Sequence, residues 1–428
     1  MITRIEAYGY RCFSRLTIDL DRHHVIVGTN GSGKTTLLDV PVLLGDLVRE
    51  QRVAGAFLHA RPGRTPRAGA PLELLHRQEG DTISFAVEAR LPADHVDRLA
   101  STSMARLGKP VPTHLRYEVR LDVSKRTIKV SDESMFLFTE DGNRPEPGTF
   151  PQGTRDDTPL PHDDWQAVIA RERNGPTKFI PETTTRDTEI PPFRVPPERL
   201  SLDTIPADPT LFPAALWFAQ FLREDVTFLA PHWDTLRRPA PPGGPDVLEP
   251  SGQNIPWLAL ALQENDPDRF AAWLAHLRVA LPQVASVKVV EREEDSHAYF
   301  DVKHASGYGV TSTGLSEGTL RLLTLTLLPF LDETALPRLL MTEEPENGVH
   351  PRAIETVTQS LRSIGASQVW VSTHSPIVLA HTPKDEVLAA RLNDDGGADV
   401  VPGERHPRLR EWRGSLDMGT LFAAGVLS

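Results

Sequence analysis

Eight residues near the N-terminus have the types and spacing needed to hold a chain of phosphates. The run is Gly28-Thr29-Asn30-Gly31-Ser32-Gly33-Lys34-Thr35, followed by Thr36, and it matches the pattern G-x-x-x-x-G-K-[ST]. Small residues let successive backbone N–H groups turn toward a phosphate, Lys34 can bridge two phosphate groups, and the Thr35 hydroxyl can coordinate Mg²⁺. The run therefore predicts a site for a nucleoside triphosphate and Mg²⁺.

Two further segments carry side chains that suit the same chemistry. The apolar run 338–342 is followed by Glu343 and Glu344, and the apolar run 368–373 is followed by His374. A buried strand that ends in two carboxylates can supply one for Mg²⁺, through water, and one to polarise an attacking water. Each segment also has a purely structural interpretation. Glu343 and Glu344 would form an acidic turn after a core strand, and His374 would be a structural histidine.

A fourth segment places small polar residues before a helix. Leu315-Ser316-Glu317-Gly318-Thr319 precedes the apolar stretch 320–328, so Ser316 and Gly318 stand where a helix N-terminus can face an anion. The alternative is a helix start that Ser316 merely caps.

The elements around these segments support the phosphate-site interpretation. Val25-Ile26-Val27 predicts a buried strand that leads into the loop, and the residues from Lys34 to Val48 predict the helix that leaves it, bent near Asp39 by Pro41. This context disfavours a glycine-rich turn with an incidental lysine. The alternation from Arg4 to Leu20 predicts two antiparallel strands before the loop, which could place Arg11 near the nucleotide.

Taken in order, the four segments resemble the motifs of ATP-binding-cassette (ABC) ATPases. L-S-E-G-T resembles the signature motif, and the acidic and histidine segments resemble the Walker B strand and the switch histidine. Tyr10-Arg11, E-E-P-E-N-G-x-H-P and T-H-S-P are similar to the standalone RecF/SMC/OLD-like AAA family ATPases of bacteria. This resemblance covers 1–36 and 307–376.

The resemblance implies that the nucleotide is ATP, and it implies roles for individual residues. Glu343 would hold Mg²⁺ together with Thr35, although the family more often has Asp at this position. Glu344 and His374 would be catalytic, and Ser316 and Gly318 would reach the ATP of a second subunit. The Q-loop glutamine of the family is not identifiable, and Gln78 is a weak candidate.

The expected fold is α/β: an ABC-type P-loop ATPase with a central mixed or parallel sheet, an antiparallel β subdomain and an inserted helical lid. We expect an N-terminal ATPase lobe over 1–139, a Pro-rich and helical insertion over 140–300, and a C-terminal ATPase lobe over 301–428. Within these, we expect a loop from Arg52 to Gly69, a short helix from Trp165 to Glu172, and helical regions at 211–229 and 255–281.

The implied function is ATP binding and hydrolysis by a homodimer that forms on ATP and acts as a switch in DNA maintenance or anti-phage defence. OLD-type nucleases carry a Toprim domain after the histidine strand, but residues 377–428 are too few for one, and Asp394-Asp395 lie in a turn-like stretch. We therefore expect a separately encoded effector such as a nuclease. The tail from Leu409 to Phe422 is expected to pack on the chain itself or on a partner. The alternative function is the nucleotide-binding subunit of an ABC transporter.

The composition and charge of the chain limit the kinds of partner that we expect. No stretch of the 428 residues is long and apolar enough for a membrane span, and the N-terminus lacks a signal-peptide pattern, so we expect a cytoplasmic protein without a membrane partner. The single cysteine, Cys12, excludes an intramolecular disulfide and is expected in the core. The net charge of −12 argues against a generally basic surface. DNA remains a candidate partner through a basic hairpin (Arg116, Arg120, Lys125, Arg126 and Lys129), whose alternative role is an ordinary solvated face.

Overall fold

We analysed the protein as a computed structural model, which describes residues 1–61, 64–101, 110–140, 144–148, 164–173, 175–183, 190–393, 395–406 and 418–424. The chain forms two compact units. Unit 1 comprises 1–21, 39–225 and 392–400, and unit 2 comprises 22–38, 226–391 and 401–428. Asp394 and most of the predicted tail lie outside the described residues. The described end of that tail, helix α13 (Met418–Ala423), buries Leu421 in the core of unit 2.

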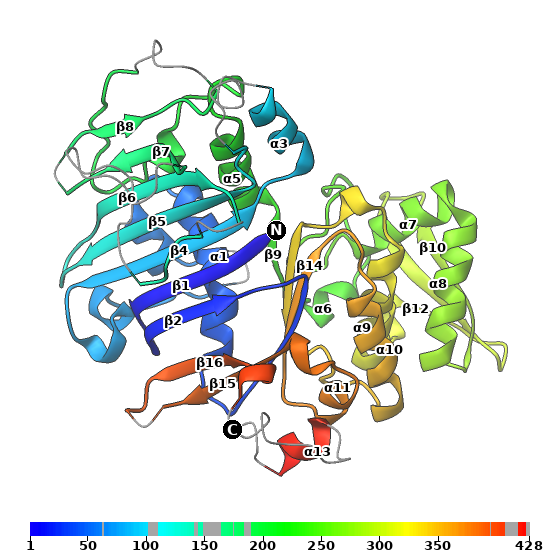
Figure 1. Cartoon of the computed structure of the whole chain (residues 1–428). Helices are drawn as coiled ribbons and strands as arrows, with labels where there is room; N and C mark the ends of the chain where they lie inside the picture. The colour runs from blue at the N-terminus through cyan, green and yellow to red at the C-terminus, as the bar shows by residue number, and fades with distance from the viewer. Residues whose placement is uncertain are drawn as a thin grey trace. The chain divides into compact units, whose positions relative to one another are not determined.

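Unit 1 is built on an antiparallel sheet, whose first two strands are those that the alternation from Arg4 to Leu20 predicts. The strand order is β2-β1-β4-β5-β6-β7-β8 (Figure 1). The strands are β1 (Ile2–Tyr10), β2 (Phe13–Asp19), β4 (Thr82–Arg90), β5 (His114–Val123), β6 (Ile128–Phe138), β7 (Gln166–Arg171) and β8 (Thr177–Phe179). Its helices are α2 (Val53–Leu58), α3 (Ala93–Ala100) and α5 (Pro213–Glu224).

Most of the sheet that carries the phosphate loop belongs to unit 2. Its strand order is β16-β15-β3-β14-β13-β9, and the neighbours from β15 to β9 are parallel. The strands are β3 (His23–Val27), β9 (Val226–Leu229), β13 (Leu339–Glu343), β14 (Gln368–Thr373), β15 (Val387–Leu392) and β16 (Ala398–Pro402). Because β3, β14 and β13 are parallel neighbours, the loops that follow them emerge at one edge of the sheet.

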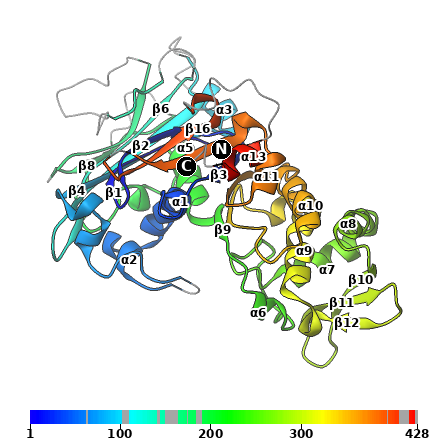
Figure 2. The ribbon, with the colours of Figure 1, turned by 90° about the horizontal axis from the view of Figure 1, so that it is seen from below.

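Helices and a small second sheet complete unit 2. The small sheet consists of β10 (Val284–Glu291), β11 (Ala298–His304) and β12 (Gly309–Thr311). The helices are α6 (Trp233–Leu236), α7 (Ile255–Asn265), α8 (Pro267–Ala280), α9 (Glu317–Leu327), α10 (Pro351–Arg362) and α11 (Pro376–Ala380). Figure 2 shows α8, α9 and α10 side by side, and their apolar side chains share one core cluster. Each fully buried Leu or Ile contributes about 1.5–3 kcal/mol to that packing.

The fold class expected from the sequence is confirmed: an α/β chain with a parallel sheet, an antiparallel sheet and an added helical region. The helix after the phosphate loop, α1 (Lys34–Arg49), continues without interruption through Pro41. Among the described residues, no helix is long and apolar enough to cross a membrane.

Four local predictions were wrong. The segment from Trp165 to Glu172 forms strand β7 rather than a helix, because it pairs with β6. Val226–Leu229 is strand β9 and not the end of a helix, because it pairs with β13. The predicted loop from Arg52 to Gly69 contains helix α2, whose Val53, Ala56 and Phe57 are buried. Cys12 is half-buried rather than a core residue.

Candidate functional site

The phosphate loop has a backbone that only small residues allow. Gly28, Gly31 and Gly33 have φ values of 154°, 78° and 96°, in the region that strongly favours glycine. A Cβ atom at Gly28 would overlap the carbonyl oxygen of Ala390 in β15, whereas a Cβ at Gly31 would meet no atom within 4 Å. Gly28 is thus required by the packing of the sheet, whereas Gly31 is required by its positive φ and not by a close neighbour.

Lys34 lies in the first turn of α1 and closes the loop. Its Nζ donates to the carbonyl oxygens of Gly28, at 2.8 Å, and Thr29, at 2.9 Å. Burial lowers the pKa of Lys34, and the carboxylates of Glu344 and Glu343 oppose that shift. The ammonium group is therefore held in the loop, within electrostatic reach of both acidic side chains.

The loop fits a bound triphosphate. The Ser32 hydroxyl is fully buried and, within the described part of the chain, has no hydrogen-bond partner. A buried polar group without a partner is costly, so an acceptor oxygen placed in the loop would stabilise it. Thr29, Asn30 and Thr35 are exposed and free to meet such a ligand, and Thr36 is half-buried.

The acidic strand and the histidine strand deliver their side chains to the same edge as the loop. In the parallel register, Glu343 pairs with Ser372, and Thr373 pairs with Val27 immediately before the loop. The sequence prediction that these three segments converge is therefore supported by the geometry of the sheet.

Glu344 and His374 lie next to each other. Glu344 Oε1 is 3.6 Å from His374 Nε2, and the two side chains are 38% and 33% exposed. The backbone of Glu344 has a φ of 45°, and its N–H donates to the Ser372 carbonyl at 2.8 Å. Asn347 donates from its side chain to the other oxygen of Glu344. A carboxylate held this way, beside an imidazole and open to solvent, can accept a proton from a water molecule.

Glu346 is a residue of this site that sequence reasoning did not single out. One carboxyl oxygen accepts from the Thr373 hydroxyl and from the His374 backbone N–H, the latter at 3.3 Å. The other oxygen is buried and has no hydrogen-bond partner among the described residues. Burial raises the pKa of Glu346, and the nearby Glu344 carboxylate raises it further. The sequence contains one hint that Glu346 belongs to the site: it follows Glu344 by two positions in the run Glu344-Pro345-Glu346.

Ser316 and Gly318 begin helix α9. Ser316 is exposed and caps the helix, accepting from the Thr319 N–H at 3.1 Å. A Cβ atom at Gly318 would lie 2.5 Å from the carbonyl oxygen of Gly348, which belongs to the turn after the acidic strand. The first turn of α9 thus packs directly on the turn that carries Glu344 and Glu346.

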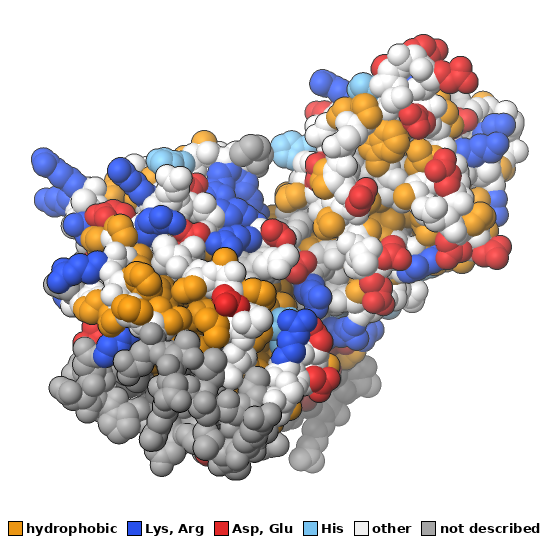
Figure 3. Space-filling model, turned by 90° about the horizontal axis from the view of Figure 1, so that it is seen from above, with side chains coloured by type: hydrophobic (Ala, Val, Ile, Leu, Met, Phe, Trp, Pro, Cys, Tyr) orange, Lys and Arg blue, Asp and Glu red, His pale blue; other side chains and the backbone are white. Residues whose placement is uncertain are grey.

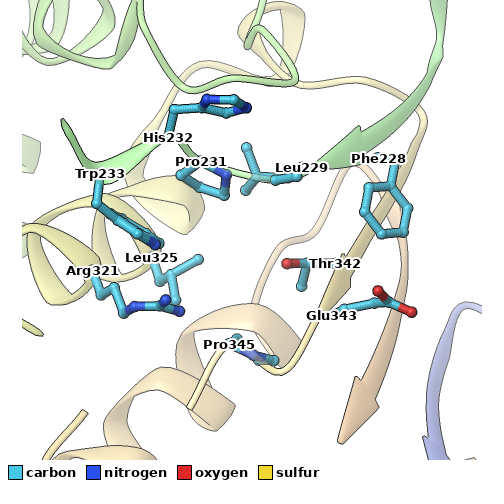
Figure 4. A pocket seen from close by; sticks show the side chains of 11 residues that line it. Phe228, Leu229, Pro231, His232, Trp233, Arg321, Leu325, Thr342, Glu343 and Pro345 are labelled. Atoms are coloured by element: carbon cyan, nitrogen blue, oxygen red, sulfur yellow. The ribbon is translucent and has the colours of Figure 1, made fainter. Parts of the chain in front are cut away.

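A pocket opens beside Glu343. It has a volume of about 420 Å³. It is lined by the end of β9 and the residues up to the start of α6, by α9, and by the end of β13 and the turn after it: Phe228, Leu229, Ala230, Pro231, His232, Trp233, Arg321, Leu325, Thr342, Glu343 and Pro345. Figure 4 shows Arg321 near the Trp233 ring, and its guanidinium carbon is 4.3 Å from the ring centroid. The sequence did not predict that the residues of and after β9 line this pocket, because β9 was predicted to be part of a helix.

Two expected contributors lie in unit 1. Arg11 has a φ of 50°, and its guanidinium donates to the Arg67 carbonyl at 2.6 Å. Gln78 lies in a short turn with a φ of 59°. A role for either residue at the nucleotide stays a prediction.

The basic hairpin is less basic at its surface than the sequence suggested. Arg116 is fully buried in unit 1, where it pairs with Glu6, Glu88 and Glu118 at 2.5–2.8 Å. Lys125, Arg126 and Lys129 are exposed. On the face in Figure 3, basic side chains are interspersed with acidic ones. Arg116 therefore cannot contribute to a DNA-binding face.

Comparison with known proteins gave one family and several structures. Residues 112–380 match the family described as "AAA domain, putative AbiEii toxin, Type IV TA system", over more than half of the chain. This range includes the signature, acidic and histidine segments, and the phosphate loop precedes it. No curated protein matches the chain.

Three of the similar solved structures are SMC heads. One is an SMC head bound to the C-winged helix domain of ScpA, at 14% identity and a TM-score of 0.49 over 94% of this chain and 96% of that chain. Another is the Smc head with an extended coiled coil bound to the C-terminal domain of ScpA, from Pyrococcus furiosus, at 12% identity and a TM-score of 0.47 over 94% and 95%. A third is the SMC head domain from Thermotoga maritima, at 11% identity and a TM-score of 0.41 over 94% and 98%.

Proposed function

The chain belongs to the AAA-domain family described as a putative AbiEii toxin of a Type IV TA system, and on this premise we propose that it is an ATP-hydrolysing molecular switch. Membership in this family agrees with the recognition of an AAA-type ATPase from the sequence motifs. The finer statements that follow, on catalytic roles, pairing and partners, are our proposal.

One observation carries the proposal: the 3.6 Å approach of Glu344 to His374 at the sheet edge that also bears the phosphate loop. Lys34 feels the charge of Glu343 and Glu344, so the phosphate-binding and acidic groups share one electrostatic environment. In this site Glu344 accepts the proton of the attacking water, and His374 lies beside it to contact the terminal phosphate.

Thr35 and Glu343 are the residues that would hold Mg²⁺. When bound there, Mg²⁺ would supply positive charge that neutralises the phosphate oxygens. The Thr35 hydroxyl is exposed at the start of α1, and Glu343 is half-buried at the end of β13. The residues of the loop from Gly28 to Thr36 bind and orient the phosphates.

A second copy of the chain completes the site. Ser316 is exposed at the N-terminus of α9, where the helix dipole and free N–H groups favour an anion. With Gly318, it contacts the ATP held by the partner copy. ATP then stabilises the pair because it contacts both copies only in the closed state, and hydrolysis releases them.

The output of the switch is the control of a separately encoded effector, such as a nuclease, in anti-phage defence or DNA maintenance. The family description, which names a toxin of a Type IV TA system, favours the defence role. Direct DNA binding and the nucleotide-binding subunit of a transporter are the alternatives. Purification of the native assembly, followed by identification of the co-eluting chains, separates these outputs.

The test of the switch is a hydrolysis-deficient variant. We expect Glu344→Gln to bind ATP, to hydrolyse it at least about tenfold more slowly, which is about 1.4 kcal/mol in the barrier, and to accumulate dimer in light scattering. The matched variant Ser316→Arg should bind ATP as a monomer, because it blocks the surface that meets the partner's nucleotide. An unchanged rate in Glu344→Gln would exclude Glu344 as the base, and normal pairing of Ser316→Arg would exclude the shared site.

A further inference from the structure

The turn that carries the catalytic acid is fastened to the strand end that carries the histidine. The Glu344 N–H donates to the Ser372 carbonyl at 2.8 Å, so one backbone hydrogen bond joins the two segments. A second connection runs through Glu346, whose Oε1 accepts from the Thr373 hydroxyl and from the His374 N–H.

The connection through Glu346 continues into the next residue. The Thr373 hydroxyl, which donates to Glu346, also accepts from the Ser375 N–H at 2.9 Å. Ser375 in turn caps α11, accepting from the Val378 N–H. The backbone on both sides of His374 is therefore held by a chain of hydrogen bonds that begins at one carboxyl oxygen.

Burial strengthens this series of hydrogen bonds. Thr373 is fully buried, and the Glu346 carboxyl oxygen that makes no hydrogen bond among the described residues is shielded from solvent. Hydrogen bonds in such surroundings are electrostatically stronger than at the surface, and breaking one leaves a buried group unpaired. His374 itself is partly exposed, so its imidazole is placed mainly by this backbone anchor.

We propose that Glu346 is a positioning residue for the Glu344–His374 pair, acting by fastening the strand end at Thr373 and His374 to the acidic turn. It touches neither the nucleotide nor the attacking water. Its absence would let His374 move away from Glu344 while the phosphate loop, on β3 and α1, stays intact. This inference rests on the proposed function, because it assumes that Glu344 and His374 act on ATP.

The expected signature is a split between turnover and binding. Removing the carboxyl group in Glu346→Ala should lower kcat about tenfold, less than the roughly 10²–10⁴-fold loss expected when a general base is removed outright, and leave the KM for ATP unchanged. Glu346→Gln keeps an acceptor oxygen for Thr373 and His374. Because the amide can still accept both hydrogen bonds, its kcat should stay within about threefold of the wild type.

The experiment measures kcat and KM for ATP in both variants, with binding of a fluorescent ATP analogue as a second readout. Glu333→Ala, at an exposed position in unit 2, is the matched control and should leave kcat unchanged. Thr373→Val removes the hydroxyl and keeps the shape of the side chain, so it should also lower kcat. It replaces Glu346→Ala as the test variant if Glu346→Ala does not fold.

The outcomes separate this inference from the proposed function. If the wild type turns over ATP and Glu344→Gln does not, but Glu346→Ala and Thr373→Val match the wild type, the positioning role is wrong and the switch stands. A rise in KM with constant kcat would also overturn it, because that result places Glu346 in nucleotide binding. If the wild type itself does not hydrolyse ATP, the proposed function fails first.

Discussion

The contact between Gly318 and Gly348 gives a prediction whose sign can be worked out from the structure. A Cβ atom at Gly318 would lie 2.5 Å from the Gly348 carbonyl oxygen, which is 0.9 Å closer than the 3.4 Å at which ordinary contact begins. The neighbouring atom is backbone and cannot rotate away. The change Gly318→Ala must therefore displace either the first turn of α9 or the turn that carries Glu344.

Two effects oppose each other in this variant. Alanine is favoured over glycine in a helix by at most about 1 kcal/mol, and by less at Gly318 because it lies in the first turn of α9. Overpacking costs about 1–3 kcal/mol in a well-packed core, and the lower part of that range applies here because Gly318 is half-buried and Gly348 is exposed. The overlap therefore dominates, and we expect Gly318→Ala to lower the free energy of unfolding by about 1–2 kcal/mol.

The assay is urea denaturation of the wild type, of Gly318→Ala and of Gly365→Ala. Gly365 is the matched control: it is exposed, has no positive φ, and a Cβ there would meet no atom within 4 Å. Its replacement should be neutral or stabilising, by up to about 1 kcal/mol.

Activity gives a second measurement on the same proteins. Because Gly348 belongs to the turn in which Asn347 donates to Glu344, displacement of that turn should lower kcat roughly tenfold in Gly318→Ala, given that a 1 Å misplacement can cost about 100-fold. If Gly318→Ala is as stable and as active as Gly365→Ala, the packing of α9 on the acidic turn is not as described.

Two other predictions concern nucleotide binding and pH. Lys34→Ala should weaken ATP binding at least about tenfold, since a hydrogen bond from a charged group contributes about 1.5–3 kcal/mol; calorimetry that finds unchanged affinity would remove the loop from the site. Glu182 is fully buried and accepts from the Ala214 and Ala215 N–H groups at the start of α5, and burial raises its pKa from 4.5 to about 7. Because the folded state holds this proton more tightly than the unfolded state, the contribution to stability is complete below pH 4.5 and is lost as pH rises to 7, by about 3 kcal/mol in total. The unfolding free energy of Glu182→Gln should lack this pH-dependent component, and parallel wild-type and variant curves from pH 4 to 8 would contradict the assignment.

The parts of the site that the sequence predicted are those fixed by local patterns. The phosphate loop can be recognised in the sequence because Gly28, Gly31 and Gly33 must adopt positive φ values, and few other residue types can. Strands β3, β13 and β14 are short apolar runs followed directly by polar residues, which is typical of buried parallel strands. From these runs, the meeting of Glu344 and His374 at one sheet edge could be anticipated.

The parts that could not be predicted depend on pairing between distant segments. Val226–Leu229 continues an apolar helical stretch, and only its ladder with β13 makes it a strand. The segment Gln166–Arg171 has no clear period of its own and is extended because β6 lies beside it. The burial of Glu346 and of Arg116 likewise follows from neighbours far away in sequence, so neither the hydrogen bonds of Glu346 nor the loss of a basic face at Arg116 could be seen in advance.

The position of β3 in its sheet has a consequence for biosynthesis. This strand, residues 23–27, is made long before its partners β14 and β15, which begin at residues 368 and 387. At about 5–20 residues per second, a ribosome needs on the order of half a minute to supply them. During that time the loop strand has neither of its hydrogen-bonding neighbours, and a chain that stops before residue 368 cannot assemble the nucleotide pocket. The sheet that carries the phosphate loop is thus complete on both sides of β3 only after translation has passed the histidine strand and β15.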